Sequence, residues 1–288
     1  MPSQTKQQPI SLKMTLKPEI KLTKRNYYSH HSDLVYMSAT WFKRFEACEA
    51  AAWDLLQHPV EETSTALLVG NFIHSNYESQ QAHAAFIKDH DSEINTRNGT
   101  LRAPFEQAEA MIDRLNKFDE FMYFYNSPEC KKEAIVTGQL FGVNWKAKLD
   151  SLNVEKGYFC DLKTTMDMHR TFYNPETHKY DRLWFDEYNY GLQMAAYKKL
   201  LQLKYHKPFK CYVFAVDKSK SPAVEAIEFD MQRFEKGLSE IELYQPRLMA
   251  VLSEKEAPIR CEHCDFCKST YEPFGFKSVD DLVNEKYQ

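Results

Sequence analysis

The sequence has little of what marks unusual protein classes. Its 288 residues include only 8 glycines and 12 prolines, which excludes collagen-like and low-complexity chains and argues against long flexible linkers. No apolar run is long enough to span a membrane, and the lysine-containing start lacks the apolar segment of a signal peptide. The net charge is only −4, so any contact with nucleic acid needs a local basic surface. These absences predict a cytoplasmic globular protein.

The sequence does contain enough apolar material for one large core. Hydrophobic residues make up 43% of the chain and aromatic residues 14%. A chain of this length suffices for one large domain, which we expect to span residues 28–270. Residues 1–27 are basic and predict a flexible arm, and residues 271–288 predict a C-terminal tail.

The stretch from residue 143 to residue 165 carries the main chemical signal. Its alternating pattern predicts two strands joined by a short turn. Asp150 lies near the end of the first strand and Asp161 lies inside the second, so a hairpin brings two carboxylates together. Such carboxylates repel each other, and a divalent cation relieves that repulsion. Lys163 projects from the same face as Asp161. The three residues suit metal-assisted phosphodiester hydrolysis, although a same-face Asp–Lys pair is more often a solvated ladder pair.

Hydrophobic periodicity predicts the remaining elements. Apolar residues recur at helical spacing in five segments and follow strand patterns in five others. This order predicts an α/β (α+β) fold with a central mixed sheet flanked by helices. The predicted helices cover residues 38–55, 70–90, 105–125, 188–203 and 234–252, and the predicted strands cover residues 133–141, 143–152, 158–164, 210–216 and 223–229.

Basic and polar residues outside the hairpin give weaker signals for nucleic-acid contact. Ser38 is a good helix N-cap with Lys43 and Arg44 nearby, an arrangement that could seat a phosphate. An ordinary cap beside a solvated basic face explains the same pattern. Arg170 lies in an aromatic and basic loop, residues 166–186, which suits contact with bases and phosphates but is equally typical of a polar surface loop.

Five of these residues have a spacing that resembles the PD-(D/E)xK nucleases. They are two acids, a lysine two residues after the second acid, and a glutamine–tyrosine pair on a later helix: Asp150, Asp161, Lys163, Gln193 and Tyr197. The set resembles the RecB-like branch of this superfamily, which has a restriction-endonuclease-like core. It is most similar to the exonuclease VIII (RecE-type) group of phages and prophages, which is related to lambda exonuclease. Gly70 and His74 match the Gly-x-x-x-His of that group. The resemblance covers residues 28–270.

The resemblance implies a role for each matching residue. One or two divalent ions, Mg²⁺ or Mn²⁺, would lie among His74, Asp150, Asp161 and the backbone carbonyl of Leu162. Lys163 would orient the attacking water.

The resemblance also implies residues around that centre. Gln193 would brace it together with Tyr197 and contact the DNA backbone, and Glu133 would lie behind the ligands. With the loop arginine included, the candidate DNA contacts are Ser38, Lys43, Arg44, Arg170 and Tyr197.

The implied reaction is metal-dependent degradation of the 5′-ended strand of linear double-stranded DNA. It leaves a 3′ single-stranded tail for a RecT-like annealing protein in the cytoplasm of a bacterial host. Some members of the group form homo-oligomeric rings. Two alternatives stay open: a RecB-like single-strand or flap nuclease of other polarity, and a non-catalytic DNA-binding scaffold. The intact acids and lysine argue against the scaffold.

The seven cysteines form a second candidate constellation. In a chain without an export signal they predict metal ligands or free thiols rather than disulfides. Cys261, Cys264 and Cys267 have C-x₂-C-x₂-C spacing, a strong metal-binding signal that is one ligand short. Several RecB-like nucleases hold a [4Fe–4S] cluster with one early and three late cysteines, which favours Cys48 as the fourth ligand. The late cysteines are closer together here than in those relatives. The resemblance favours a [4Fe–4S] cluster, but because of this closer spacing zinc with Cys48 or His263, and thiols without metal, remain open.

Overall fold

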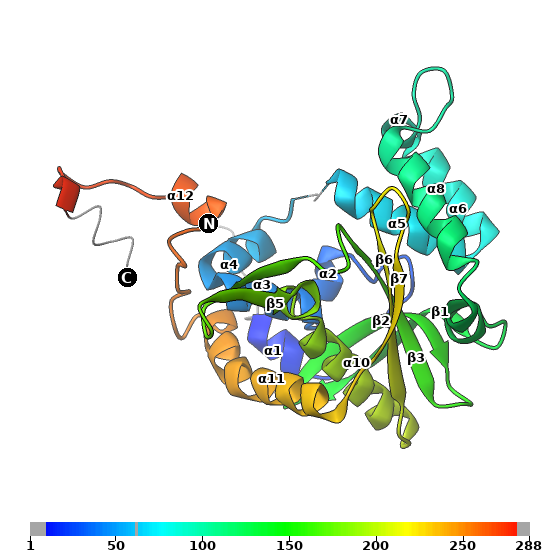
Figure 1. Cartoon of the computed structure of the whole chain (residues 1–288). Helices are drawn as coiled ribbons and strands as arrows, with labels where there is room; N and C mark the ends of the chain where they lie inside the picture. Colours follow the sequence, from blue (N-terminus) through cyan, green and yellow to red (C-terminus); the bar gives the residue numbers. More distant parts are fainter. Residues whose placement is uncertain (1–9, 61–62, 281–288) are drawn as a thin grey trace, which may run out of the picture.

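The structure is a computed structural model that describes residues 10–60 and 63–280. Its central feature is a five-stranded mixed sheet (Figure 1). The strands are β1 (Lys131–Leu140), β2 (Val143–Asn153), β3 (Tyr158–Thr165), β4 (Thr171–Asn174), β5 (Lys179–Leu183), β6 (Lys210–Asp217) and β7 (Val224–Glu228). The order in the sheet is β1-β2-β3-β6-β7, with β3 and β6 parallel and the other neighbours antiparallel. The predicted mixed sheet is confirmed. The loop expected over residues 166–186 instead contains β4 and β5, a separate two-stranded hairpin.

Helices cover both faces of this sheet (Figure 1). They are α1 (Ile10–Thr15), α2 (His30–Asp33), α3 (Ala39–Ala47), α4 (Glu49–Gln57), α5 (Thr65–Glu78), α6 (Gln80–Asp89), α7 (Asp91–Ile94), α8 (Ala103–Leu115), α9 (Trp184–Glu187), α10 (Tyr190–Tyr205), α11 (Met231–Leu252) and α12 (Asp265–Ser269). One core lies between the sheet and α1, α3, α4, α10 and α11. A second core lies between the other face and α5, α8 and a π-helical turn, Phe121–Tyr125. Within the described residues, no helix has the length and apolar character needed to cross a bilayer.

Alternation along the strands explains why the sheet divides the two cores. Phe159 of β3 packs in the core on the α10 side, while its neighbours Cys160 and Leu162 pack in the core on the α5 side. All three are at most 1% exposed. In β2, Trp145 and Ala147 point into the α10-side core, as the pattern predicts.

Three predicted helices are interrupted, two of them by a single extended residue and the third ahead of a wider, π-helical turn. Cys48, with φ −164° and ψ 107°, separates α3 from α4. Ser79, also extended, separates α5 from α6, and its hydroxyl accepts from the Ala82 amide at the start of the new helix. The third predicted helix ends as α8, before the π-helical turn. Since α5 already begins at Thr65, His74 lies in its third turn rather than the first.

A buried lysine ties the segment before α3 to the sheet. Lys146 of β2 is 2% exposed, and its ammonium donates to the carbonyl of Tyr27 at 2.7 Å, the hydroxyl of Ser32 at 2.6 Å and Asp33 at 2.6 Å. A buried charge needs such partners. Earlier in the chain, Met14 of α1 is 1% exposed in the α10-side core.

Ile10, Met14 and Tyr27 are therefore buried against the domain within the segment predicted to be a flexible arm, while most of residues 15–26 are exposed or half-buried. Residues 1–9 of that arm and residues 281–288 of the predicted tail lie outside the described residues. The predicted domain boundaries stay predictions.

Glu49 joins the start of α4 to the C-terminal part of the chain. It is 5% exposed and accepts hydrogen bonds from the Arg247 guanidinium at 2.6 and 2.9 Å, the Ile259 amide at 2.8 Å and the Tyr244 hydroxyl at 3.0 Å. Burial raises the pKa of Glu49, but these donors, Arg247 foremost, outweigh burial and hold that pKa below its usual value of 4.5.

We predict that Glu49→Gln lowers the free energy of unfolding by about 2 kcal/mol at neutral pH, because a charge-assisted network loses its anion. A lowered folded-state pKa stabilises the fold above pH 4.5, and that stabilisation is lost as the pH falls through the lowered value. The difference from wild type should therefore shrink below pH 4.5. Urea unfolding at several pH values measures it. Glu256→Gln, at the exposed partner of the same arginine, is the matched control. An equal loss at every pH would contradict this assignment.

Candidate active site

The candidate site lies where β2 and β3 separate. The two strands pair only through Ser151–Asn153 and Tyr158–Cys160, so their ladder stops before Asp150 and Asp161. The amide of Leu162 donates instead to Asp150 Oδ2, at 2.7 Å. On its other edge, β3 stays paired with β6 along its whole length. The opening in the sheet therefore receives carboxylates while β3 itself remains fixed.

Glu133 enters the same opening from β1. The β1–β2 ladder pairs the residues on either side of Glu133 but skips Glu133 itself, which faces Asp150. Its backbone has φ 53°, a left-handed conformation that costs a non-glycine residue on the order of 1 kcal/mol. Glu133, which the resemblance implied to lie behind the ligands, lies beside His74 and Asp150.

His74 completes a cluster of three candidate ligands. Its Nδ1 lies 3.5 Å from Asp150 Oδ2. An imidazole nitrogen of His74 and one carboxylate oxygen each of Glu133 and Asp150 all lie within 4.8 Å of one another. An imidazole nitrogen with two carboxylates is a donor set that binds divalent cations.

Burial controls the charge state of this cluster. It raises the pKa of Asp150, and it raises that of Glu133 with a further contribution from repulsion by Asp150. It also lowers the pKa of His74, which favours the neutral imidazole that can bind a metal. The three groups therefore disfavour their own ionisation in the absence of a cation, as expected for a site that holds one.

Asp161 adds a buried carboxylate that is paired with Lys163. Its Oδ2 lies 2.6 Å from Lys163 Nζ, and among the described side chains no other donor reaches this oxygen. Burial, and secondarily Asp150, raise the pKa of Asp161 to about 6 against the opposing effect of Lys163. A buried carboxylate close to Asp150, with one lysine as its ion-pair partner, fits a site that binds a divalent cation.

Helix α10 and helix α3 close the site from the other side. Gln193 Nε2 donates to the Tyr197 hydroxyl at 3.2 Å, so the predicted pair does share one face of α10. Lys43 Nζ donates to Gln193 Oε1 at 3.4 Å. The ring of Tyr190 lies close to two ammonium groups, with Lys163 Nζ 4.6 Å and Lys43 Nζ 5.3 Å from its centroid.

Tyr190 was not among the predicted site residues. Its position three residues before Gln193 puts it on the same helical face, a signal that was present in the sequence. Lys43 was predicted only as a DNA contact, and its place beside Gln193 depends on a contact between residues far apart in the chain.

Three other predicted DNA contacts have local interactions. The Ser38 hydroxyl accepts from the Trp41 amide at 3.3 Å, which confirms it as the N-cap of α3. The guanidinium of Arg44 lies 5.0 Å from the Trp41 ring, and that of Arg170 lies 4.8 Å from the Phe172 ring. Their roles in DNA binding stay predictions.

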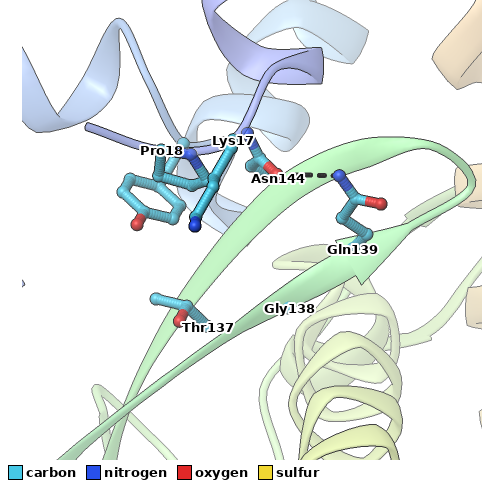
Figure 2. Close-up of a pocket in the computed structure, with 7 residues that line it drawn as sticks. Lys17, Pro18, Thr137, Gly138, Gln139 and Asn144 are labelled. Carbon is cyan, nitrogen blue, oxygen red and sulfur yellow. Dashed lines mark hydrogen bonds between the residues drawn. The ribbon is translucent and has the colours of Figure 1, made fainter. Parts of the chain in front are cut away.

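A surface hollow of about 320 Å³ lies elsewhere on the domain (Figure 2). Figure 2 shows Lys17 and Pro18 on one side and β1 and β2 on the other, where Gln139 donates to Asn144 at 3.2 Å. No candidate ligand lines this hollow, and its lining contains no carboxylate. It does not belong to the active site.

The four cysteines form a second cluster, at the start of α4 and around α12. Their sulfur atoms lie within 4.8 Å of one another: Cys48, Cys261, Cys264 and Cys267. The structure thus brings together the set that the sequence analysis selected.

Comparison with known proteins agrees with this geometry. Residues 38–270 match the family described as a PDDEXK-like domain of unknown function (DUF3799). A solved structure from Eubacterium rectale, which carries the provisional name of an exonuclease, has 29% sequence identity, covers 92% of this chain and 98% of its own, and has a TM-score of 0.83. The structure of SSO0001 has 13% identity over 82% of this chain and 96% of its own, and its TM-score of 0.29 is too low to indicate a shared fold. No curated protein matches the sequence.

We predict that Asp150→Asn abolishes Mn²⁺ binding at this acidic cluster without lowering the stability of the protein free of Mn²⁺. The amide oxygen can still accept from Leu162, while one of the mutually repelling charges is removed. For wild type, Mn²⁺ at about 100 times its Kd should add about 2.7 kcal/mol to the free energy of unfolding, and the variant should lose this increment. Thermal unfolding with and without Mn²⁺ measures both quantities.

Asp119→Asn, at an exposed acid, is the control and should keep the wild-type increment. An unchanged Mn²⁺ effect in Asp150→Asn would remove Asp150 from the metal site.

Proposed function

The chain belongs to the PDDEXK-like DUF3799 family, and from this premise we propose that it is a divalent-metal-dependent DNA exonuclease. One observation carries the proposal: the cluster of His74, Glu133 and Asp150 adjoins the Asp161–Lys163 pair at an opening in the sheet. PDDEXK nucleases use divalent metals. The provisional name of the Eubacterium rectale protein supports exonuclease chemistry for this chain.

We assign the cation, Mg²⁺ or Mn²⁺, to His74, Glu133, Asp150 and Asp161, with the carbonyl of Leu162 as a further candidate. When bound, it supplies Lewis-acid activation of water and neutralises charge on the phosphate. The residues of the chain hold and orient the reacting groups around it.

Lys163 is the fixed cation of this arrangement. Burial lowers its pKa, but Asp161 and neighbouring groups outweigh burial and raise that pKa above its usual value, so Lys163 stays charged. It is suited to orient the attacking water and to stabilise negative charge on a phosphate oxygen. Gln193 and Tyr197, joined by their hydrogen bond, offer polar groups to the DNA backbone.

The direction of digestion is part of the proposal. We propose that the enzyme degrades the 5′-ended strand of linear duplex DNA and leaves a 3′ tail. Such a tail is the substrate of a single-strand annealing protein, the proposed partner. This assignment rests on the resemblance to the RecE-type group, as does the proposed ring-shaped oligomer.

We predict that Mg²⁺-dependent digestion of a linear duplex releases nucleotides from the 5′ ends first. The assay uses duplexes labelled separately at each 5′ and each 3′ end, with either a 5′-phosphate or a 5′-hydroxyl. Asp161→Ala and Lys163→Ala should each lower the rate by at least about a hundredfold, since each removes a group that acts on the reacting phosphate. Lys156→Ala, at a surface lysine outside the site, should keep the wild-type rate.

Release from the 3′ ends first would reverse the proposed polarity. Cleavage of single strands or flaps alone would replace the duplex exonuclease with the alternative nuclease. If the protein bound DNA but cleaved it under none of these conditions, the alternative of a non-catalytic DNA-binding scaffold would be the one supported.

Lys43 gives the proposal a pH-dependent test. Burial, and secondarily the charge of Lys163, lower its pKa to about 8. Its ammonium is therefore charged below that pH and neutral above it. A lysine beside Gln193 is suited to bind a backbone phosphate.

We predict that the affinity for a fluorescent duplex, measured in EDTA so that no cleavage occurs, falls as the pH rises through about 8. Lys43→Arg should remove this decline, because a guanidinium stays charged. Lys43→Ala should weaken binding about tenfold below that pH, the effect of one lost charge-assisted contact of about 1.5 kcal/mol. The same pH decline in Lys43→Arg would show that another group titrates.

A further inference from the structure

We infer that the four-cysteine cluster is a structural site for a single tetrahedral zinc ion rather than for an iron–sulfur cluster. The sulfur atoms of Cys48 and Cys267 lie 3.6 Å apart, and those of Cys261 and Cys267 lie 3.9 Å apart. Zinc binds thiolate sulfur at about 2.3 Å, and a tetrahedron of that radius has edges of about 3.8 Å. The two measured separations bracket this value.

The same separations leave no room for a [4Fe–4S] cluster. In such a cluster each of the four thiolates binds a different iron, so the whole iron–sulfide cube lies between the sulfur atoms. Here the four cysteine sulfur atoms all lie within 4.8 Å of one another. The cluster that the resemblance favours therefore does not fit the spacing of these residues.

The backbone around the late cysteines is shaped to hold thiolates. The amide of Cys264 donates to Cys261 Sγ at 3.3 Å, and the amide of Cys267 donates to Cys264 Sγ at 3.4 Å. Each C-x₂-C step thus turns an N–H group toward the preceding sulfur and favours its anionic, metal-binding form. His263 lies outside the cluster: its Nδ1 lies 2.5 Å from the Cys261 carbonyl, its side chain is exposed, and the four clustered ligand atoms are all cysteine sulfurs.

Cys48 reaches the cluster because it interrupts the first predicted helix. Its extended backbone lies between α3 and α4, and its side chain is 6% exposed against the buried Cys267. The Ala50 amide donates to the Ile259 carbonyl at 3.0 Å and aligns the two segments. A metal here links positions 219 residues apart, and all four ligands come from protein, as in structural zinc sites.

The test is the metal content of the full-length protein, produced in bacteria supplied with both iron and zinc. We expect one zinc per chain by elemental analysis, no acid-labile sulfide, and no visible absorption from iron–sulfide charge transfer. Protein produced with cobalt should show the visible spectrum of tetrahedral cobalt–thiolate, a readout that needs no variant.

Three variants locate the ion. Cys264→Ser should lose the zinc. Cys130→Ser, at a thiol outside the cluster, should keep it. Asp150→Asn should also keep it, which separates the cysteine site from the candidate active site. Nuclease activity is not the readout, so the outcome does not depend on the proposed function.

Iron with acid-labile sulfide in wild type would overturn the inference, as would reduced thiols with no bound metal or disulfides within the cluster. Zinc that disappears in Asp150→Asn but persists in Cys264→Ser would place the ion in the active site and would also overturn it.

Discussion

The rest of the structure is arranged around carboxylates that repel one another at a place where the sheet opens. Glu133, Asp150 and Asp161 come from three adjacent strands and face a common space from which most water is excluded. Buried charges of one sign are tolerated only with counter-charges or a bound cation. Two lysines supply part of the compensation, because Lys148 pairs with Glu133 and Lys163 pairs with Asp161. A divalent cation would compensate the anionic charge that these two lysines leave, above all that of Asp150.

The scaffold holds these groups by fixing the register of β3. A shift by one residue would move Phe159 out of the α10-side core and Cys160 and Leu162 out of the α5-side core, so both cores oppose it. Continuous pairing with β6 holds the same strand from its other edge. Since Asp161 and Lys163 lie on this strand, their positions are set by packing and not by their mutual attraction. The unfavourable backbone energy of Glu133 at positive φ is then offset by the packing of the two cores.

Much of the fold was predictable because it depends on local patterns. Alternation located β2 and β3, and with them Asp150 and Asp161, and helical spacing put Gln193 and Tyr197 on one face. Features that depend on a single backbone conformation or on distant contacts left no periodic signal. The extended backbone of Cys48 ended a helix inside an unbroken apolar stripe. Glu133 joined the cluster through its cross-strand position, and Lys43 joined it through a contact with α10.

The two candidate metal sites differ in donor chemistry, and this difference has a consequence for which ion each one takes. Zinc binds nitrogen, oxygen and sulfur donors more tightly than magnesium does, so affinity alone would let zinc occupy both sites. Four thiolates close the coordination sphere of zinc, whereas His74 and the carboxylates leave positions for water and phosphate oxygen, which suit Mg²⁺ or Mn²⁺. The cysteine site joins Cys48, just after α3, to the segment that follows α11. Because α3 carries Lys43 into contact with Gln193, an ion that fixes the end of α3 also steadies one wall of the active site without taking part in its chemistry.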